Sequence, residues 1–372
     1  MQPKKFSPIM MLAGEASGDL YGGHLVKALK TLNPDLQFFG MGGPRMKEAG
    51  VDIHVQAKEV AVVGALEVLT HFFRILRAAR HLKKLIKEKK PCLLILIDFP
   101  DFNFHIAKFA KKLKIKIFYY ISPQVWAWRK GRVKTIKKLV DLMMVILPFE
   151  VDFYKKENFS VCFEGHPLID IVKPDLQPLL KKTYPTIGLL PGSRDEEIKQ
   201  LLPVLIETAL MLKKDYPNAH FILPLASTLS KEMMLPYLEK NNLPLDIISN
   251  QTYAALASCD VIITASGTIT LEAALLQTPM VIIYKLKTLS YLLGRLLVKV
   301  PHIGLCNLIA NERIVPELLQ NEVTPERISI EVKKILNDTS VIKTKLLKIR
   351  NLLGEKDVNQ RIAITVSKLI SK

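Results

Sequence analysis

The sequence predicts two α/β domains, each built on a parallel β-sheet with helices on both faces. Strand-like apolar runs alternate with longer helical stretches along most of the chain. The apolar runs are continuous rather than alternating with polar residues, which is typical of strands buried on both faces. A length of 372 residues also exceeds what one hydrophobic core usually spans. Together these observations favour two doubly wound sheets.

The predicted strands fall into two series. The first comprises Ile9–Ala13, Leu36–Phe39, Cys92–Ile97, Ile115–Ile121, Leu142–Leu147 and Val161–Phe163. The second comprises Thr186–Leu190, His220–Leu223, Leu245–Ile248, Val261–Thr264 and Met280–Tyr284. Three prolines interrupt the polar stretch between them, so we assign residues 1–172 and 173–345 to two domains. Helical patterns over 325–336 and 341–370 follow, and residues 346–372 form a C-terminal helical segment.

Composition limits the class of protein. Hydrophobic residues make up 49% and charged residues 24%, which is typical of a globular chain. The four cysteines lie far apart without a C-x-x-C pair, which favours buried thiols in a reducing compartment. The apolar N-terminal run is too short for a signal peptide, and no run approaches the ~20 apolar residues of a membrane span. We therefore expect a cytoplasmic protein.

The net charge of +18 indicates anionic partners. Much of it lies in residues 1–172, which hold 28 Lys and Arg against 16 Asp and Glu. Nucleic acid, acidic lipid and phosphorylated substrates all fit such a bias, and charge alone does not choose among them.

The first motif is Gly14–Asp19, between the first strand and a helix. Its glycines permit a tight turn, but it is not a G-x-G-x-x-G fingerprint, and no acidic residue ends the second strand. A nicotinamide cofactor is therefore disfavoured. Ser17 or Asp19 fits a helix cap as well as it fits a binding site.

The second motif is Asp98–Asn103, directly after a buried strand. A carboxylate at that point is partly desolvated, which raises its pKa toward that of a general base. Asp101 and Asn103 are favoured as caps of the next helix, whereas Asp98 comes too early for that role. Asp98 is therefore the preferred base.

Both tryptophans of the chain lie in Ser122–Arg129, after the next strand. Paired tryptophans at a strand end suit a sugar or acyl pocket, or else a plug at the base of the domain. Five basic residues follow between 130 and 138, which suits either phosphate contact or a solvated helix face.

Two turns in the second half, Leu190–Arg194 and Ser266–Glu272, each leave a predicted strand and open a predicted helix. Unpaired N–H groups and positive helix ends would therefore meet at one sheet edge. Arg194 adds a charge-assisted contact to phosphate, and Glu272 suits the hydroxyls of a ribose. The turns predict a nucleoside diphosphate site formed by Gly192, Ser193, Arg194, Ser266, Gly267, Thr268 and Glu272.

Several other kinds of site are absent from the sequence pattern. The G-K-[ST] element of a Walker loop is missing, and no G-x-S-x-G nucleophile elbow is present. No His, Cys, Asp or Glu cluster has metal-ligand spacing, so we expect no metal.

The stretch Val60–Lys90 predicts a helix with an apolar stripe and a basic opposite face. Such a helix suits an anionic membrane surface. A crossover helix that covers the sheet explains the pattern equally well, and both hold if one end protrudes. The residues expected to meet lipid are Leu66, Leu69, Phe72, Phe73 and Leu76.

These motifs, taken in order with four further segments, resemble those of the lipid-A-disaccharide synthase family. The further segments are Leu147–Glu150, Gly165–Pro167, Asn307–Ala310 and Pro316–Gln320. The resemblance runs in register over about residues 7–320. Ile269 and Cys306 depart from the family pattern, which often has a smaller residue and a proline there, without removing a polar group.

The resemblance implies an inverting, metal-independent glycosyltransferase of the GT-B type, with two facing Rossmann-like domains and no cofactor. Such enzymes join UDP-2,3-diacylglucosamine to the 6-hydroxyl of 2,3-diacylglucosamine 1-phosphate and release UDP. Asp98 would be the base, while Arg194 and the Ser266–Thr268 turn would stabilise the departing UDP and Glu272 would hold its ribose. Asn307 and Gln320 are expected at the nucleotide or donor sugar. The acceptor side would be lined by Ser17, Gly18 and Asp19.

The resemblance also implies peripheral association with the anionic cytoplasmic face of the inner membrane, and it leaves a homodimer open. Alternatives are another UDP-N-acetylglucosamine enzyme of the same architecture, either an epimerase or a peptidoglycan-precursor transferase, or a membrane-adsorbed scaffold. A basic nucleic-acid-binding protein is disfavoured because aromatic-rich single-strand and recognition-helix patterns are missing. We therefore expect no nucleic-acid partner.

Overall fold

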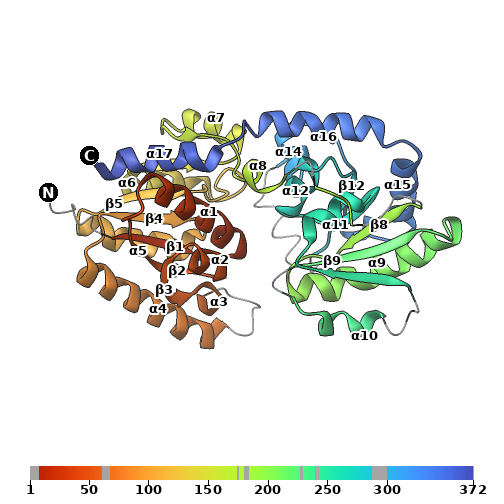
Figure 1. Cartoon of the computed structure of the whole chain (residues 1–372), viewed down its shortest axis with the longest axis horizontal. Helices are drawn as coiled ribbons and strands as arrows, with labels where there is room; N and C mark the ends of the chain where they lie inside the picture. The colour runs from red at the N-terminus through yellow and green to blue at the C-terminus, as the bar shows by residue number, and fades with distance from the viewer. Residues whose placement is uncertain are drawn as a thin grey trace. The chain divides into compact units, whose positions relative to one another are not determined.

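The computed structural model shows a chain that folds as two compact units (Figure 1). It describes residues 8–60, 68–173, 176–179, 184–226, 229–238, 241, 243–286 and 300–371. The first unit comprises Met1–Asp170 with Gly354–Lys372, and the second comprises Ile171–Leu353. Among the described helices, none is both long enough and apolar enough to span a bilayer.

The first unit is built on a seven-stranded parallel sheet in the order β3-β2-β1-β4-β5-β6-β7. All neighbouring strands pair in parallel, so their carboxyl ends share one edge. Central strands β1 and β4 are wholly buried, as their continuous apolar sequences require. The strands are β1 Ile9–Ala13, β2 Phe38–Gly42, β3 Val51–Gln56, β4 Leu93–Ile97, β5 Lys116–Tyr120, β6 Leu142–Val145 and β7 Cys162–Phe163.

Helices and one 3₁₀ turn connect these strands and cover the sheet. These elements are α1 Ala16–Leu32, α2 Pro44–Glu48, α3 Ala57–Val60, α4 Val68–Lys89, α5 Pro100–Lys112, η1 Lys130–Arg132, α6 Val133–Leu139, α7 Pro148–Lys156, α8 Leu168–Ile171 and α17 Val358–Ser371. Buried side chains of the helices α3 to α7 join those of the strands in an apolar core. The α8 range ends one residue beyond this unit.

The second unit repeats the architecture with a six-stranded sheet in the order β10-β9-β8-β11-β12-β13. Its strands are β8 Thr186–Leu190, β9 His220–Leu225, β10 Leu245–Ser249, β11 Val261–Ala265, β12 Met280–Tyr284 and β13 Glu317–Leu319. Its helices and 3₁₀ turns are α9 Asp195–Asp215, η2 Lys231–Met233, α10 Leu235–Leu238, α11 Thr252–Ser258, α12 Ile269–Leu275, α14 Leu305–Ala310, η3 Gln320–Glu322, α15 Pro325–Asn337 and α16 Ser340–Leu352. All strand pairs are again parallel.

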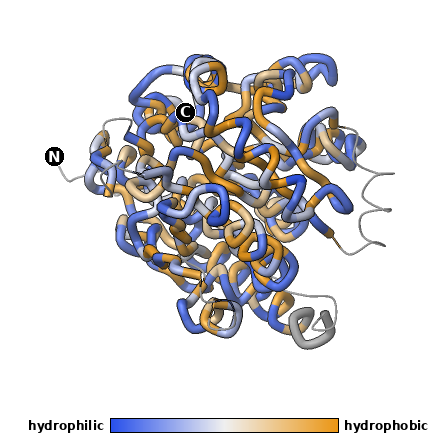
Figure 2. The backbone as a smooth tube through the Cα atoms, turned by 90° about the vertical axis from the view of Figure 1, so that its right-hand side faces the viewer, coloured by the Kyte–Doolittle hydropathy of each residue, from blue (hydrophilic) through white to orange (hydrophobic). Residues whose placement is uncertain are grey.

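The sequence prediction of two parallel-sheet α/β domains is confirmed, and every predicted strand is present with small shifts at its ends. In Figure 2 hydrophobic (orange) stretches follow the strands, whereas many helices carry both colours. Strands β3 and β13 were not predicted. Strand β3 lies at a sheet edge and has polar residues at alternate positions, and β13 has only three residues. Neither gives the continuous apolar run by which the other strands were recognised.

The C-terminal helix α17 packs against α1 in the first unit. The single helical pattern predicted over 341–370 is divided in two, because Gly354 adopts φ +110° between α16 and α17. A Cβ at Gly354 would lie 3.0 Å from the Cα of Gly165, so the close approach also requires glycine. The Asp170 carboxylate accepts hydrogen bonds from the backbone N–H groups of Val358 and Asn359, which caps the start of α17.

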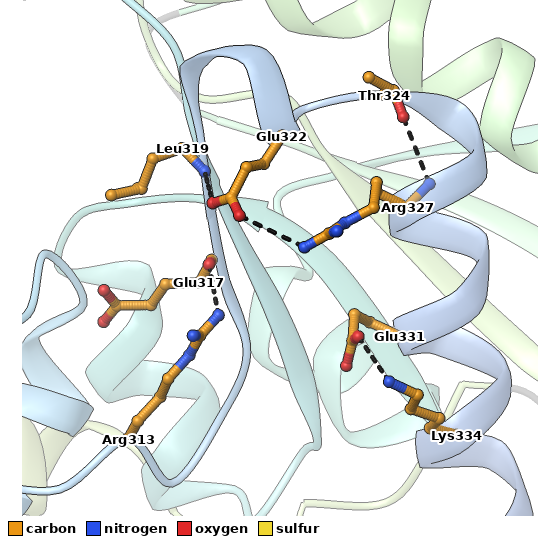
Figure 3. Close-up of polar contacts among 8 residues, drawn as sticks. All are labelled: Arg313, Glu317, Leu319, Glu322, Thr324, Arg327, Glu331 and Lys334. Carbon is orange, nitrogen blue, oxygen red and sulfur yellow. Dashed lines mark hydrogen bonds and ion pairs between the residues drawn. The ribbon is translucent and has the colours of Figure 1, made fainter.

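Strand β13 forms one edge of the second sheet, and side chains bind its Glu317 carbonyl and its Leu319 N–H (Figure 3). Arg313 donates to the Glu317 carbonyl at 2.6 Å, and Glu322 accepts from the Leu319 N–H at 3.3 Å. Arg327 donates in turn to the Glu322 carboxylate at 3.3 Å. An edge whose groups are engaged in this way offers less of a template for pairing with another strand.

A buried polar clamp joins α14 to β13. The Asn307 amide donates to the Val315 carbonyl and to the Glu317 carboxylate, at 2.9 and 2.8 Å. Its oxygen accepts from the N–H groups of Ile314 and Val315. The amide has two donors and two acceptor positions, and all four are used. Asn307 therefore fixes the loop that leads into the edge strand.

We expect Asn307→Ala to lower the free energy of unfolding by about 3–5 kcal/mol, because several buried polar groups would lose their partner at about 1–3 kcal/mol each. Denaturant unfolding measures the change. Asn337→Ala is the matched control, since Asn337 is exposed at the end of α15. Equal stability of the two variants would contradict the clamp.

Candidate active site

Asp98 lies immediately after β4, at the carboxyl edge of the first sheet. Both Asp98 and Phe99 adopt left-handed backbone conformations, with φ of +44° and +47°. Two consecutive non-glycine residues in this region are strained, and such strain persists only where surrounding contacts determine the conformation. The chain is therefore held in a sharp turn at the point where the sequence placed the candidate base.

Hydrogen bonds hold this turn from two elements. The Asp98 carbonyl accepts from the Tyr119 hydroxyl of β5 and from the Asn103 amide of α5, both at 2.7 Å. The Asn103 amide also donates to the Ile97 carbonyl at 3.3 Å. The sequence expectation that Asp101 or Asn103 caps α5 is wrong, because the helix starts at Pro100 and its N-cap residue is Phe99. Asp101 is exposed and pairs with Arg129 and Arg132 instead.

The electrostatic environment of Asp98 suits a proton acceptor. The pKa of its carboxyl is raised to about 7, mainly by burial and to a smaller extent by the charge of Glu15, while the hydrogen bond from the Phe99 N–H opposes the rise. A pKa near 7 lets a carboxylate take up a proton near neutral pH, which an ordinary aspartate does poorly. A strongly perturbed pKa at a sheet edge is typical of functional sites.

The Gly14–Asp19 motif forms the turn between β1 and α1, as predicted, but its polar residues serve differently from the cap expectation. The N-cap residue of α1 is Glu15, without a side-chain hydrogen bond. Asp19 is buried, and its carboxylate accepts from the N–H groups of Gly43, Arg45 and Met46 at 2.7–3.0 Å. Asp19 therefore ties α1 to the start of α2. Contact between an acceptor and Ser17, Gly18 or Asp19 remains a prediction.

Glu150 is a buried acidic residue to which sequence reasoning gave no separate role. Its carboxylate accepts from the Trp126 indole at 3.1 Å and from the N–H groups of Ile146 and Leu147. Burial raises the pKa of Glu150 to about 7, and the Asp98 charge contributes to the rise. Tyr154 of the same helix shares a 2.7 Å hydrogen bond with Ser122. Helix α7 thus anchors the tryptophan-containing segment near Asp98.

In the second unit, the turn Gly192–Arg194 follows β8 and starts α9. Gly192 has φ +120°, and a Cβ there would lie 2.2 Å from the Glu197 carboxylate. One oxygen of that carboxylate accepts from the N–H groups of Ser193 and Arg194, and the other accepts from the Arg194 guanidinium at 3.0 Å. The amides predicted to meet phosphate are therefore occupied by Glu197. The Arg194 side chain is 66% exposed and remains accessible to an anion.

The second turn, Ser266–Thr268, follows β11, the strand next to β8. Ser266 donates to the Ile303 carbonyl at 2.9 Å, which secures the turn. The backbone N–H groups of Gly267, Thr268 and Ile269 donate to no acceptor within the described part of the chain. A Cβ on Gly267 would meet nothing within 4 Å, so the space beside this turn is open.

Glu272 lies on α12, one turn after these amides, and accepts from the Tyr253 hydroxyl at 3.3 Å. Burial raises the pKa of its carboxyl to about 7, although part of the residue is accessible to solvent. An ordinary exposed helical glutamate would not show this shift. The position suits recognition of hydroxyl groups beside the Ser266–Thr268 turn.

Asn307 and Gln320, the two remaining residues predicted at the donor substrate, differ in how many of their hydrogen-bonding groups are already used. The Asn307 amide is fully used in the clamp, so contact with a nucleotide would require one of those bonds to break. Gln320 follows β13 and accepts from the Leu286 N–H at 2.8 Å.

Tyr284, the last residue of β12, was predicted only as a strand end. The charges of Arg194 and Glu197 both influence its pKa, which places it near the first turn.

Only some of the residues predicted to meet the membrane belong to the described part of the chain. Leu66 lies outside the described residues, and the side chains of Leu69 and Phe72 are likewise outside them. Phe73 is 68% exposed on α4, whereas Leu76 is half-buried. Further along α4, buried Ala78, Leu82 and Ile86 belong to the core. The helix therefore covers the sheet with its C-terminal part and exposes Phe73 near its start.

The predicted site residues take part neither in a metal-binding cluster nor in an open groove within the described part of the chain. No group of three His, Cys, Asp or Glu capable of holding a metal occurs among the described residues. An open groove beside β13 is lined by Arg313, Ile314, Val315, Pro316, Leu318, Arg327 and Glu331. None of the predicted site residues lines that groove.

Solved structures with the same fold include UDP-GlcNAc 2-epimerases and glycosyltransferases. A UDP-GlcNAc 2-epimerase from Neisseria meningitidis, bound to UDP-GlcNAc, matches with a TM-score of 0.70 at 13% identity over 97% of this chain and 100% of the other. The calicheamicin glycosyltransferase CalG4 matches with a TM-score of 0.63 at 14% identity over 99% of both chains. At these identities the likeness establishes the fold alone.

Sequence comparisons also identify the family. The family model for lipid-A-disaccharide synthetase matches residues 9–367. A lipid-A-disaccharide synthase from Geobacter metallireducens is 48% identical over 98% of this chain and 97% of its own length. Those from Trichlorobacter lovleyi and Coxiella burnetii are 46% and 43% identical over at least 97% of each chain. This chain belongs to the lipid-A-disaccharide synthase family of glycosyltransferases.

Proposed function

We propose that this protein transfers 2,3-diacylglucosamine from its UDP conjugate to the 6-hydroxyl of 2,3-diacylglucosamine 1-phosphate, with inversion at C1 and release of UDP. The family supplies the reaction class. Within the structure, the observation that carries the assignment of roles is Asp98. Its backbone is strained, and its desolvated carboxyl lies at a sheet edge with a pKa of about 7.

Asp98 acts as the general base. It accepts the proton of the acceptor 6-hydroxyl, and the oxygen attacks C1 of the donor on the face opposite UDP. The C1–O bond to the diphosphate then breaks, and its electron pair leaves with UDP. Tyr119 and Asn103 hold the Asp98 carbonyl, so they keep the carboxylate in place without touching substrate.

The second unit binds the donor nucleotide. Arg194 and the amides of Gly267, Thr268 and Ile269, which donate to no acceptor among the described residues, stabilise the charge that grows on the departing diphosphate. Since Glu197 occupies the amides of Ser193 and Arg194, the diphosphate is met on that side by the guanidinium. Glu272 accepts hydrogen bonds from the ribose, and Gln320 lies near the donor at the end of β13.

Both lipid substrates reside in a membrane, and we propose that the protein docks on the cytoplasmic face of the inner membrane through α4. Phe73 and the basic residues Arg74, Arg77, Arg80, Lys84 and Lys87 are exposed on this helix. An exposed aromatic side chain with surrounding cations suits an interface that contains anionic lipid.

The reaction itself is tested by measuring UDP release in detergent with diacylated donor and diacylated acceptor phosphate, and again with the unacylated sugars. We expect turnover with the diacylated pair only. Epimerisation of unacylated UDP-N-acetylglucosamine without transfer would overturn the proposed reaction.

Asp98→Asn should reduce kcat by about 10²–10⁴-fold, because the amide cannot accept the proton. For the parent enzyme, kcat/KM should rise with pH through about 7, because the base works only when ionised. Calorimetry should show that Asp98→Asn binds UDP as tightly as the parent does. Since folding disfavours the Asp98 charge, the variant should unfold at no lower temperature than the parent at pH 8. Near-normal turnover would remove Asp98 as base.

Arg194→Ala should cost about 3 kcal/mol in the transition state, roughly a hundredfold in kcat/KM, because one cationic partner of the leaving group is lost. UDP affinity should fall as well. Lys199→Ala is the matched control, since Lys199 is an exposed cation on the same helix whose partner is Glu196. Equal effects of the two substitutions would reduce Arg194 to a contribution of general surface charge.

Replacing both Arg74 and Arg77 by glutamate should weaken binding to vesicles containing anionic lipid by at least about tenfold, because each cation near such a surface contributes about 1 kcal/mol. Vesicle cosedimentation measures this. The control replaces exposed Lys214 and Lys348 of the second unit by glutamate, which changes the net charge equally. Similar losses in both variants would contradict docking through α4.

A further inference from the structure

A second carboxylate leaves the same sheet edge beside Asp98. Strands β1 and β4 are neighbours, and their last residues, Ala13 and Ile97, are register partners. Glu15 comes two residues after β1, and Asp98 comes one residue after β4. The two acidic side chains are therefore carried by adjacent strand ends.

Direct packing joins the two segments. Gly14 has no side chain, and the Phe99 ring fills the space that one would need, since a Cβ there would lie 2.3 Å from the ring Cγ. The residues next in sequence to this contact are Glu15 and Asp98. Glu15 is exposed, and its carboxylate has no hydrogen bond or ion pair within the described part of the chain. Its charge is thus uncompensated.

The groups that face Asp98 come from several elements, and those that carry charge are acidic. Glu15 precedes α1, Glu150 lies on α7, and Tyr119 lies on β5. The charge of Glu15 raises the pKa of Asp98, and among the described residues no cation lowers it. Arg132, whose charge influences Tyr119, pairs with Asp101, as does Arg129.

We propose that Glu15 and Asp98 form a functional carboxylate pair, in which Asp98 takes the acceptor proton and the negative charge of Glu15 keeps that proton on Asp98. This inference rests on the proposed function and deepens it. The O6–H bond of the acceptor breaks as an Asp98 O–H bond forms, the O6 electron pair bonds to C1, and UDP departs with the C1–O pair. Glu15 takes no proton from the acceptor and is a positioning residue that acts by its charge.

The test compares Glu15→Gln, which removes the charge, with Glu15→Asp, which keeps it. The pH at which kcat/KM reaches half its plateau should fall by about 0.5–1 unit in Glu15→Gln, as expected for losing one like charge at short range near the surface. Glu15→Asp should shift that midpoint by less than half as much. UDP binding should not change in either variant, because the nucleotide site lies in the second unit.

Asp101→Asn is the matched control, because Asp101 is an exposed carboxylate on the neighbouring segment whose charge is already paired. Its midpoint should equal that of the parent. Raising the salt concentration from about 0.05 to 0.5 M should shrink the difference between Glu15→Gln and the parent, since salt screens an exposed charge. A purely structural role of Glu15 would not respond to salt in this way.

Three results would overturn the inference. The first is an unchanged or raised midpoint in Glu15→Gln, and the second is an equal shift in Asp101→Asn. The third is a loss of about a hundredfold or more at every pH in Glu15→Gln while Asp98→Asn stays active, which would make Glu15 the base. Failure of the proposed function is distinct, because the parent would then release no UDP from the diacylated substrates.

Discussion

The left-handed turn at Asp98 and Phe99 is the constraint on which the first unit's site depends. It is strained for two non-glycine residues, and it persists because a hydroxyl, an amide and a ring each fix part of it. The turn brings a carboxylate out of a buried strand without exposing it fully to water. Desolvation is the main reason that the pKa of this aspartate is raised to about 7, where a carboxylate can accept a proton near neutral pH.

Neighbouring groups support this turn. The absence of a side chain at Gly14 gives Phe99 its place, so the glycine matters for what packs on it rather than for its own backbone angles. Asp19 and Glu150 are buried carboxylates that receive three hydrogen bonds each from the chain around them. Buried charges of this kind must be surrounded by donors, and here they tie loops at the carboxyl edge to the helices that follow.

In the second unit, too, a carboxylate accepts hydrogen bonds from backbone N–H groups at the start of a helix. Glu197 satisfies two amides at the start of α9 and holds the Arg194 guanidinium, while the N–H groups of Gly267, Thr268 and Ile269 donate to no acceptor in the described part of the chain. The positive groups available to an anion are therefore a guanidinium from one turn and backbone amides from the adjacent strand end. The proposed nucleoside diphosphate would present negative charge to these groups and ribose hydroxyls to Glu272.

The sequence by itself determined the two parallel sheets and the order in which Asp98, Arg194 and Glu272 follow their strands, because continuous apolar runs and turn residues are local patterns. It did not determine β3, β13 or the real partners of Asp19, Asn103 and Asn307, whose hydrogen bonds reach backbone groups that only folding brings near. It also did not reveal that Glu197 occupies the amides of the Gly192–Arg194 turn or that Glu15 lies beside Asp98. Only the tertiary structure decided these, since burial and the adjacency of strands far apart in sequence set the charge that each carboxylate feels.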